Sequence, residues 1–281
     1  MEVELLDPSG EVDNCVRVAR GEADFCLSRV AAYLAAAPVA ARYVAVLVGR
    51  SPICAFVPAS SAITRPDQLS GRRVGGGVWA MAEFVGAMSW LGLAPASVVP
   101  MSRTSGGGLL QEACAMLAAG RVEMVADFED LLPRARRHSG MDLRSVPLGA
   151  EVYSSGLVAG DGVADELVGQ VCAAVLAALE RQRHDPALWL PELLAGSPRV
   201  VPADAIEGWQ LVEPRIFARE QPGSMTKEGW AATLAYSGSA LEPAAVWRQP
   251  AAPPVAGSRE HRLRQSDALS KGRAAFMEAP G

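Results

Sequence analysis

Short apolar runs alternate with longer segments of helical spacing through the first half of the chain. One helix is predicted by apolar residues at positions 12, 15, 16 and 19, the i, i+3, i+4, i+7 spacing of a helix face. Buried strands are predicted by short apolar runs at residues 3–6, 23–27, 43–48, 55–57, 98–101, 122–126 and 143–146. This alternation, with short glycine-containing connections, predicts an α/β fold with mostly parallel sheets.

The pattern becomes almost entirely helical from residue 165 onward. Helices are expected at residues 167–183, 187–194, 203–217 and 226–236. After residue 250 the chain is rich in proline and alanine and then polar. This composition predicts a loose C-terminal tail over residues 250–281.

Residues 71–93 form the unit best suited to contact a ligand. A strand is predicted at residues 72–74, a glycine loop at residues 75–77, and then an apolar helix that ends at Gly92. Glycines lack a Cβ, so backbone N–H groups can approach a ligand, and the helix N-terminus favours an anionic or strongly polar group. The pattern matches neither a dinucleotide fingerprint nor a P-loop, and a tight turn without a ligand is the alternative.

Composition and charge exclude several classes of function. Half of the 281 residues are apolar, enough for one large core or two modest ones. The net charge is −5 and basic residues do not cluster, which argues against a nucleic-acid partner. No apolar run approaches the roughly 18 residues that a membrane span needs.

Cysteine and histidine spacing supports neither a metal site nor a disulfide framework. The five cysteines are odd in number and form no CxxC pair, and the three histidines lie far from them in sequence. We therefore expect buried thiols, no metal and no cofactor.

Two segments about a hundred residues apart resemble one another. In residues 19–27 and again in residues 118–126, a helix ends at a glycine and an acidic residue opens a buried strand three positions later. Two α/β lobes of related topology would produce such a repeat. Chance similarity in an alanine-rich chain is the alternative.

A series of short segments then carries a family resemblance. The segments VELLDPSG, GEADFCLS, SAITRPDQLSGRRVGGG, LGLAPASVV, LAAGRVEMV and VYSSGLVAG occur in this order between residues 3 and 247. In order and spacing they resemble the SsuA/THI5-like (NMT1-like) substrate-binding proteins of ABC transporters, which have the type II periplasmic-binding-protein fold. Glu123 stands where that family commonly has Asp. Family members usually begin with a further strand and helix behind an export signal, and the resemblance here starts only at VELLDPSG, so we expect a chain that is truncated at its start or that begins at a late methionine.

The resemblance implies two α/β lobes that close on a small ligand, with a helical C-terminal part. It places the crossings between lobes at residues 56–61 and 148–155. Lobe one would comprise residues 1–61 and 148–249, and lobe two residues 62–147. Ligands of the family include sulfonates, taurine, nitrate, and pyrimidine and flavin precursors, which are delivered to an ABC transporter permease. Family members are periplasmic or anchored at the cell surface, whereas this chain as written, without a signal peptide, would be cytoplasmic.

Ligands of open α/β sheets bind beyond the carboxyl ends of the strands, and this rule selects five loops. The expected ligand-binding residues are Ser28, Arg29, Gly76, Gly77, Trp79, Ser102, Thr104, Asp127, Phe128, Glu151 and Tyr153. Their mixture of one cation, two carboxylates and aromatic rings predicts a heteroaromatic or zwitterionic ligand rather than a simple inorganic anion. The alternatives are structural: an ion pair for Arg29, core packing for Trp79 and a helix N-cap for Asp127.

Two other functions remain as alternatives to a solute-binding protein. An enzyme on the same fold would resemble either a pyrimidine-precursor synthase, whose cysteine-rich metal motif is absent here, or a cysteine-dependent desulfinase. The candidate nucleophiles are Cys26 and Cys54, but Cys26 lies within a predicted strand, which favours an inert buried thiol. A cytoplasmic ligand sensor is the other alternative. We expect a binding protein and not an enzyme.

Overall fold

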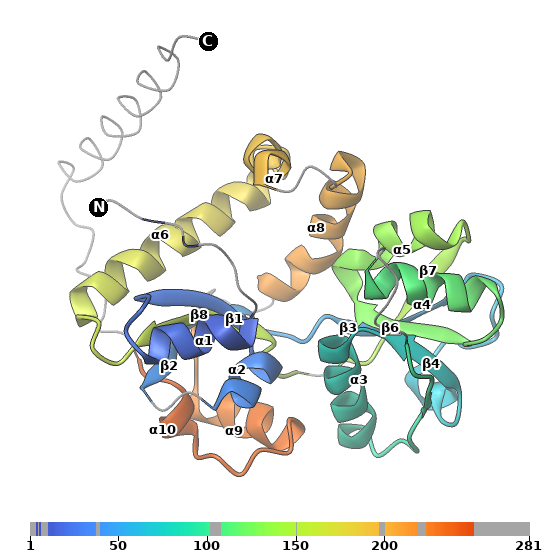
Figure 1. Ribbon diagram of the computed structural model, residues 1–281, viewed down its shortest axis with the longest axis horizontal. Helices are drawn as coiled ribbons and strands as arrows, with labels where there is room; N and C mark the ends of the chain where they lie inside the picture. Colours follow the sequence, from blue (N-terminus) through green and yellow to red (C-terminus); the bar gives the residue numbers. More distant parts are fainter. Residues whose placement is uncertain are drawn as a thin grey trace, which may run out of the picture.

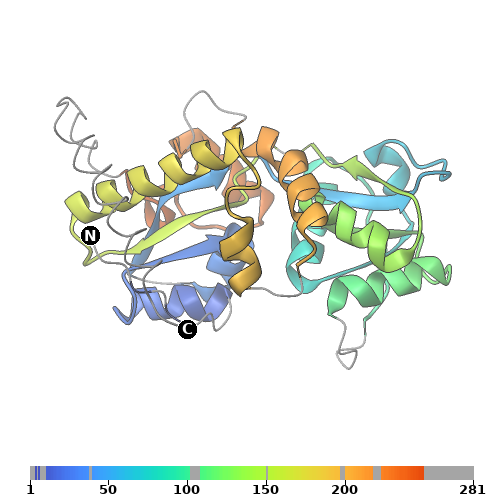
Figure 2. The same ribbon diagram turned by 90° about the horizontal axis from the view of Figure 1, so that it is seen from above.

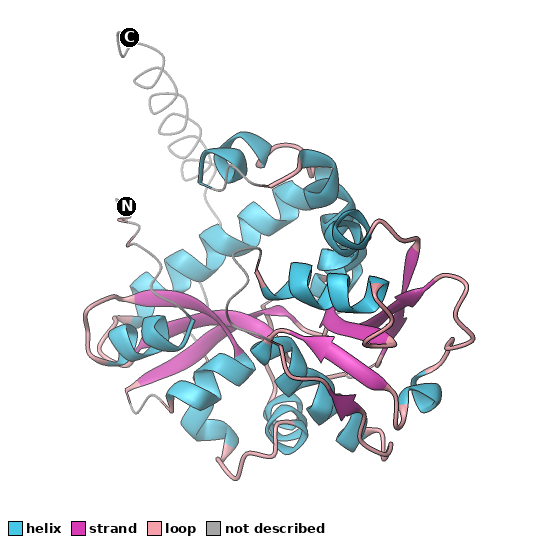
Figure 3. Cartoon of the chain, turned by 45° about the vertical axis from the view of Figure 1, so that its right-hand side comes forward, coloured by secondary structure: helices cyan, strands magenta, loops and turns pink. Residues whose placement is uncertain are grey.

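The computed structural model describes residues 4, 6, 11–37, 40–101, 108–149, 151–196, 200–217 and 223–249. Within these residues the strands form two sheets that lie side by side, each with its own helices (Figure 1). Helices lie on both sides of the strands, so the predicted α/β class is confirmed (Figure 3). The predicted tail and most of the predicted strand at residues 3–6 lie outside the described residues.

The three-stranded sheet has β8 (Ser155–Gly160) at its centre, between β1 (Phe25–Arg29) and β2 (Ala41–Val48). Both outer strands pair antiparallel with β8. One face is covered by α1 (Glu11–Ala19), α2 (Val30–Ala36), α9 (Lys227–Tyr236) and α10 (Pro243–Val246). The opposite face is covered by α6 (Asp165–His184). The helix predicted from the apolar positions 12, 15, 16 and 19 is therefore confirmed as α1.

The five-stranded sheet has the order β5-β4-β6-β3-β7. Its strands are β3 (Ile53–Pro58), β4 (Arg73–Gly76), β5 (Ser97–Val98), β6 (Met124–Phe128) and β7 (Leu143–Pro147). Successive side chains of a strand point to opposite faces. The odd-numbered residues of β3 pack with α3 (Val78–Trp90), and the even-numbered ones pack with α4 (Leu109–Ala118) and α5 (Leu132–Ser139).

The expectation of mostly parallel sheets is wrong. β4 pairs in parallel with β5 and β6, but β3 pairs antiparallel with β6 and β7, as β8 does with β1 and β2. β3 and β8 are the strands that follow the two connections between sheets, and each lies between strands that run the opposite way. A strand buried on both faces shows the same apolar run in either direction, so the sequence pattern could not reveal this.

The chain crosses between the sheets earlier than the sequence predicts. The predicted first crossing, residues 56–61, overlaps β3, which already pairs with β6 and β7. The chain instead leaves β2 and reaches β3 through residues 49–52, and it returns through residues 148–154 between β7 and β8. The predicted strand at residues 55–57 is confirmed as part of β3, but an apolar run does not show to which sheet a strand belongs.

Helix α8 (Pro202–Ile216) comes from the C-terminal part of the chain but packs against the five-stranded half, after α7 (Leu190–Gly196). It contacts α5 and the short helix η2 (Glu129–Leu131). The view from above shows α8, in orange, beside the five-stranded half (Figure 2). An ion pair of 2.8 Å joins Arg137 Nε to Asp204 Oδ2 across this contact. The sequence-based division, which gives all of residues 148–249 to lobe one, does not anticipate this packing.

Candidate functional site

Two of the predicted site residues meet between the sheets. Arg29 ends β1 of the three-stranded sheet, and Phe128 ends β6 of the five-stranded sheet. The guanidinium carbon of Arg29 lies 4.4 Å from the centroid of the Phe128 ring. Such a cation–π contact contributes about 0.5–2 kcal/mol, depending on how far it is shielded from water. The carboxyl ends of these two strands are thus in contact across the molecule.

Asp127 lies beside this contact and is buried. Burial raises the pKa of the Asp127 carboxyl to about 6, against the opposing effect of a hydrogen bond that its Oδ1 accepts from the Phe128 N–H at 2.9 Å. The nearby Asp130 carboxylate raises this pKa further, and the charge of Arg29 lowers it. The alternative of a helix N-cap is not observed, because the N-cap position of η2 is Phe128 and makes no side-chain cap.

The predicted glycine loop is shorter than expected. Gly76 is the last residue of β4, and Gly77 is the N-cap residue of α3. A Cβ on Gly76 would lie 2.5 Å from the backbone oxygen of Ala126, so the close approach of β6 already requires glycine there. Trp79, in the first turn of α3, is half-buried.

Two other predicted residues have structural partners. Ser28 is buried, and its Oγ accepts a hydrogen bond from the Cys15 thiol at 3.2 Å. Glu151 is exposed, and its Oε1 lies 3.0 Å from Arg50 Nε, so this pair links the two connections between the sheets. The structure therefore directs Ser28 into the core and Glu151 toward solvent. Ser102 and Thr104 lie outside the described residues.

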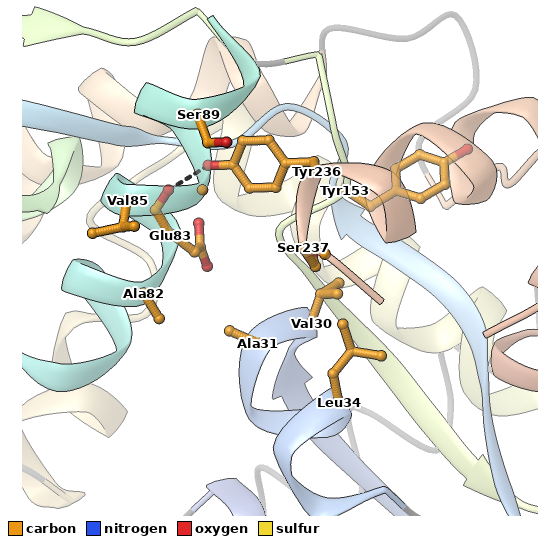
Figure 4. A pocket seen from close by; sticks show the side chains of 12 residues that line it. Val30, Ala31, Leu34, Ala82, Glu83, Val85, Ser89, Tyr153, Tyr236 and Ser237 are labelled. Atoms are coloured by element: carbon orange, nitrogen blue, oxygen red, sulfur yellow. Dashed lines mark hydrogen bonds between the residues drawn. The ribbon is translucent and has the colours of Figure 1, made fainter. Parts of the chain in front are cut away.

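Tyr153 belongs to the core of the three-stranded half. Its ring centroid lies 5.2 Å from that of Trp230, and its hydroxyl accepts a hydrogen bond from the Thr226 N–H at 3.0 Å. Tyr153 contributes to the wall of the cavity described next, but its ring points away from Glu83 (Figure 4). The predicted stacking surface is thus already used in packing.

A cavity of about 380 Å³ lies between the two halves. Its walls come from α2 and the end of α9, which pack on the three-stranded sheet, and from α3, which packs on the five-stranded sheet (Figure 4). The lining residues are Val30, Ala31, Leu34, Ala82, Glu83, Val85, Gly86, Ser89, Tyr153, Tyr236, Ser237 and Gly238. Most of this surface is apolar, and Glu83 provides a carboxylate.

Glu83 is the functional candidate that the sequence prediction missed. The residue is only 7% exposed, and its carboxylate accepts hydrogen bonds from Ser51 Oγ at 3.1 Å and from Ser154 Oγ at 3.4 Å. These two serines lie on the first and second connections between the sheets. The one available signal was an acidic residue within an otherwise apolar helix, residues 78–90.

Tyr236 fixes the backbone of α3 at the same position. Its hydroxyl donates a hydrogen bond of 2.6 Å to the backbone oxygen of Glu83 (Figure 4). Burial, and next the charge of Glu83, raise the pKa of Tyr236 well above its usual value, so the hydroxyl stays protonated and remains a donor. Groups from α9 and from both connections therefore hold Glu83 in place.

No group of three or more His, Cys, Asp or Glu side chains is placed to hold a metal ion in the described ranges. Over the same residues, every helix is too short or too polar to cross a membrane.

Comparison by sequence gives one family match. Residues 1–102 match the family model described as NMT1/THI5 like, in agreement with the resemblance found in the sequence. A comparison with curated proteins found no match.

Comparison by structure gives similar folds at low identity. The periplasmic aliphatic sulphonate binding protein SsuA from Escherichia coli has a TM-score of 0.61 at 15% identity, over 86% of this chain and 80% of that chain. The periplasmic sulfonate-binding protein SsuA from Methylobacillus flagellatus KT has a TM-score of 0.59 at 15% identity, over 84% and 75%. The alkanesulfonate-binding protein SsuA from Xanthomonas axonopodis pv. citri, bound to MOPS, has a TM-score of 0.56 at 18% identity, over 85% of each chain.

These neighbours confirm the predicted architecture. Each is named as a binding protein, and each matches over more than two thirds of its own length. The chain therefore has the type II periplasmic-binding-protein fold, and its first 102 residues are similar to the NMT1/THI5-like family.

Proposed function

We propose that this protein is a solute-binding protein, which holds a small polar or heteroaromatic molecule between its two halves for ABC-type import. The observation that carries the proposal is the cavity whose walls come from helices of both sheets. A cavity of this volume, mostly apolar with a few polar groups, is typical of small-molecule sites. The shared fold of sulfonate-binding proteins adds support.

The proposal includes two lobes and a transporter partner. Each sheet with the helices on its faces would form a lobe, and residues 49–52 and 148–154 would be the hinge between them. An ABC transporter permease would receive the ligand, as the names of the structural neighbours suggest. In this scheme Arg29, Asp127 and Phe128 lie at the interface between lobes, where a bound ligand would replace the contact of Arg29 with the Phe128 ring.

The cysteines do not favour the enzyme alternative. Cys54 is fully buried, and burial, followed by the nearby charges of Glu129 and Asp127, raises the pKa of its thiol well above the usual value. A thiol that resists ionisation is a poor nucleophile. Cys26 is partly buried, with its Sγ 3.9 Å from that of Cys15.

Calorimetric titration of alkanesulfonates, aminopyrimidines and flavin fragments tests this function. We expect saturable binding of one molecule per chain by at least one class. Ala82→Trp, which fills the cavity from α3, should weaken that binding at least about tenfold, a loss of about 1.4 kcal/mol. Ala174→Trp on the exposed side of α6 is the matched control and should bind normally. Equal affinity of the two variants, or no binding by any class, would refute the proposal.

A further inference from the structure

Helix α8 contacts both halves of the molecule on the side away from the cavity. The cavity is lined by α2, α3 and the end of α9. α6 covers the other face of the three-stranded sheet, and Leu211 of α8 packs on the face of the five-stranded sheet that α4 and α5 cover. Figure 1 shows α6 and α8 above the strands and α2, α3 and α9 below them. The cavity and α8 therefore lie on opposite sides of the strands.

The contacts of α8 with the five-stranded half are strong. Arg215 forms an ion pair with Glu129 of η2, and both side chains are only 12% exposed. A Cβ on Gly208 would overlap the backbone oxygen of Asp130, so the two backbones lie directly against each other at this point. A buried ion pair resists separation, because separation would leave buried charges without their partners. We therefore expect α8 to move together with the five-stranded half.

The contacts of α8 with α6 are weaker. Arg183, in the last turn of α6, has its Nε 2.9 Å from Glu213 Oε1 of α8. Its guanidinium carbon lies 4.5 Å from the centroid of the Phe217 ring, which follows α8 directly. The Arg183 side chain is 45% exposed, so water weakens both contacts. A change in the relative orientation of the two halves would therefore break the contacts of Arg183 before those of Arg215.

A relative movement of the two halves would act on the cavity and on the Arg183 contacts in opposite directions. The halves are joined by residues 49–52 and 148–154, and by Tyr236, whose hydroxyl donates to the backbone oxygen of Glu83 at 2.6 Å. These points would act as the pivot. Because α6 and α8 lie on the other side of the strands from α2 and α3, a movement that narrows the gap between α2 and α3 separates α6 from α8.

We propose that the contacts of Arg183 with Glu213 and Phe217 oppose narrowing of the cavity and thereby reduce its affinity for a ligand. Arg183 is a positioning residue in this scheme, because it acts on the cavity through the orientation of the two halves. The inference rests on the proposed function, because it assigns the regulation of the same cavity. A contact made in one orientation alone favours that orientation, and the apparent affinity follows the fraction of chains in the orientation that binds.

Arg183→Met tests the inference, because it removes the charge and keeps an unbranched side chain. Arg181→Met is the matched control, because Arg181 lies in the same turn of α6 and its Nε donates to the backbone oxygen of Ala177 within that helix. Spin labels attached to ketone-bearing residues at positions 115 and 174, which are exposed on α4 and α6, report the distance between the halves and leave the cysteines unmodified. Without ligand, we expect a longer label distance in Arg183→Met than in the wild type or in Arg181→Met.

Titration calorimetry supplies the second measurement, with alkanesulfonates, aminopyrimidines and flavin fragments as probes. The class that binds the wild type should bind Arg183→Met about 3- to 30-fold more tightly, the factor for an exposed ion pair and an exposed cation–π contact together. Glu213→Gln should give a smaller increase in affinity, because the contact of Arg183 with the Phe217 ring remains. Arg181→Met should bind with the affinity of the wild type.

An unchanged or shorter label distance in Arg183→Met would overturn the inference, as would equal or weaker binding of the probe by this variant. A failure of the inference differs from a failure of the proposed function. In the first case a probe binds in a manner that Ala82→Trp weakens, but Arg183→Met leaves its affinity unchanged. In the second case no probe binds in that manner, and the label distance alone decides the inference.

Discussion

Replacement of Arg215 by Met tests what holds α8 against the five-stranded half. Arg215 lies on α8, and its Nε donates a hydrogen bond of 2.7 Å to Glu129 Oε2 on η2. Its Nη1 donates to the backbone oxygen of Ser51 at 3.3 Å. Both partners of the ion pair are only 12% exposed, and Glu129 Oε1 also accepts a hydrogen bond from Ser145 Oγ. Loss of the Arg215 guanidinium would therefore leave the Glu129 carboxylate buried, with the neutral Ser145 hydroxyl as its donor.

The expected cost of Arg215→Met is about 3–5 kcal/mol, the range for breaking a buried pair by removing one partner. With a urea m-value of about 3 kcal/mol per M, the unfolding midpoint should fall by about 1 M or more. Arg137→Met is the matched control. Arg137 forms an ion pair of 2.8 Å with Asp204, which also lies on α8, but the Arg137 side chain is 43% exposed. Because surface ion pairs contribute little, this variant should lose no more than about 1 kcal/mol.

Urea unfolding followed by circular dichroism measures both variants. The double variant Arg215→Met with Glu129→Met should recover most of the lost stability, because no charge then stays buried without its partner. Equal losses for Arg215→Met and Arg137→Met, or a double variant less stable than Arg215→Met alone, would show that burial of this pair does not control the packing of α8.

Three further predictions concern single sites. Gly76→Ala should lower the free energy of unfolding by about 2–3 kcal/mol, because its Cβ would lie 2.5 Å from a backbone oxygen of β6, whereas Gly75→Ala, with its nearest contact at 3.6 Å, should lose far less; equal losses would contradict this. The raised pKa of Asp127, about 6 against 3.8, means that the folded state binds the proton more tightly, so its ionisation costs stability as pH rises from about 4 to 6. Asp127→Asn should therefore gain about 2–3 kcal/mol over the wild type across this window and show a constant difference above it, and a difference independent of pH would contradict the assignment. Cys15 and Cys26, whose Sγ atoms lie 3.9 Å apart, should be joined by a mild thiol oxidant, and peptide mapping that finds both as free thiols would refute this.

Local patterns predicted the elements of the fold well, because helix and strand periods depend on neighbouring residues alone. The apolar spacing at positions 12 to 19 gave α1, and the run at residues 122–126 gave β6 within two residues. Strand direction and sheet membership depend on distant pairing. Residues 55–57 are therefore predicted as a strand, but their apolar pattern does not show that β3 (Ile53–Pro58) pairs antiparallel with both β6 and β7.

The site was predictable only in part for a related reason. The strand-end rule brought together Arg29 and Phe128, which come from different sheets and lie in contact. The same rule cannot tell which way a side chain points, so Ser28 and Tyr153 were predicted to face a ligand but lie in the core. Glu83 lies in the middle of α3, away from any strand end, and only the packing of α2 and α3 reveals it.

A crystal structure of the protein with its tightest-binding small molecule tests the central claim most directly. We predict that the ligand lies between α2 and α3, with its apolar part against Val30 and Leu34. A ligand bound on the outer surface of one half, with the cavity between the halves unchanged, would contradict the claim that the two halves bind a solute between them.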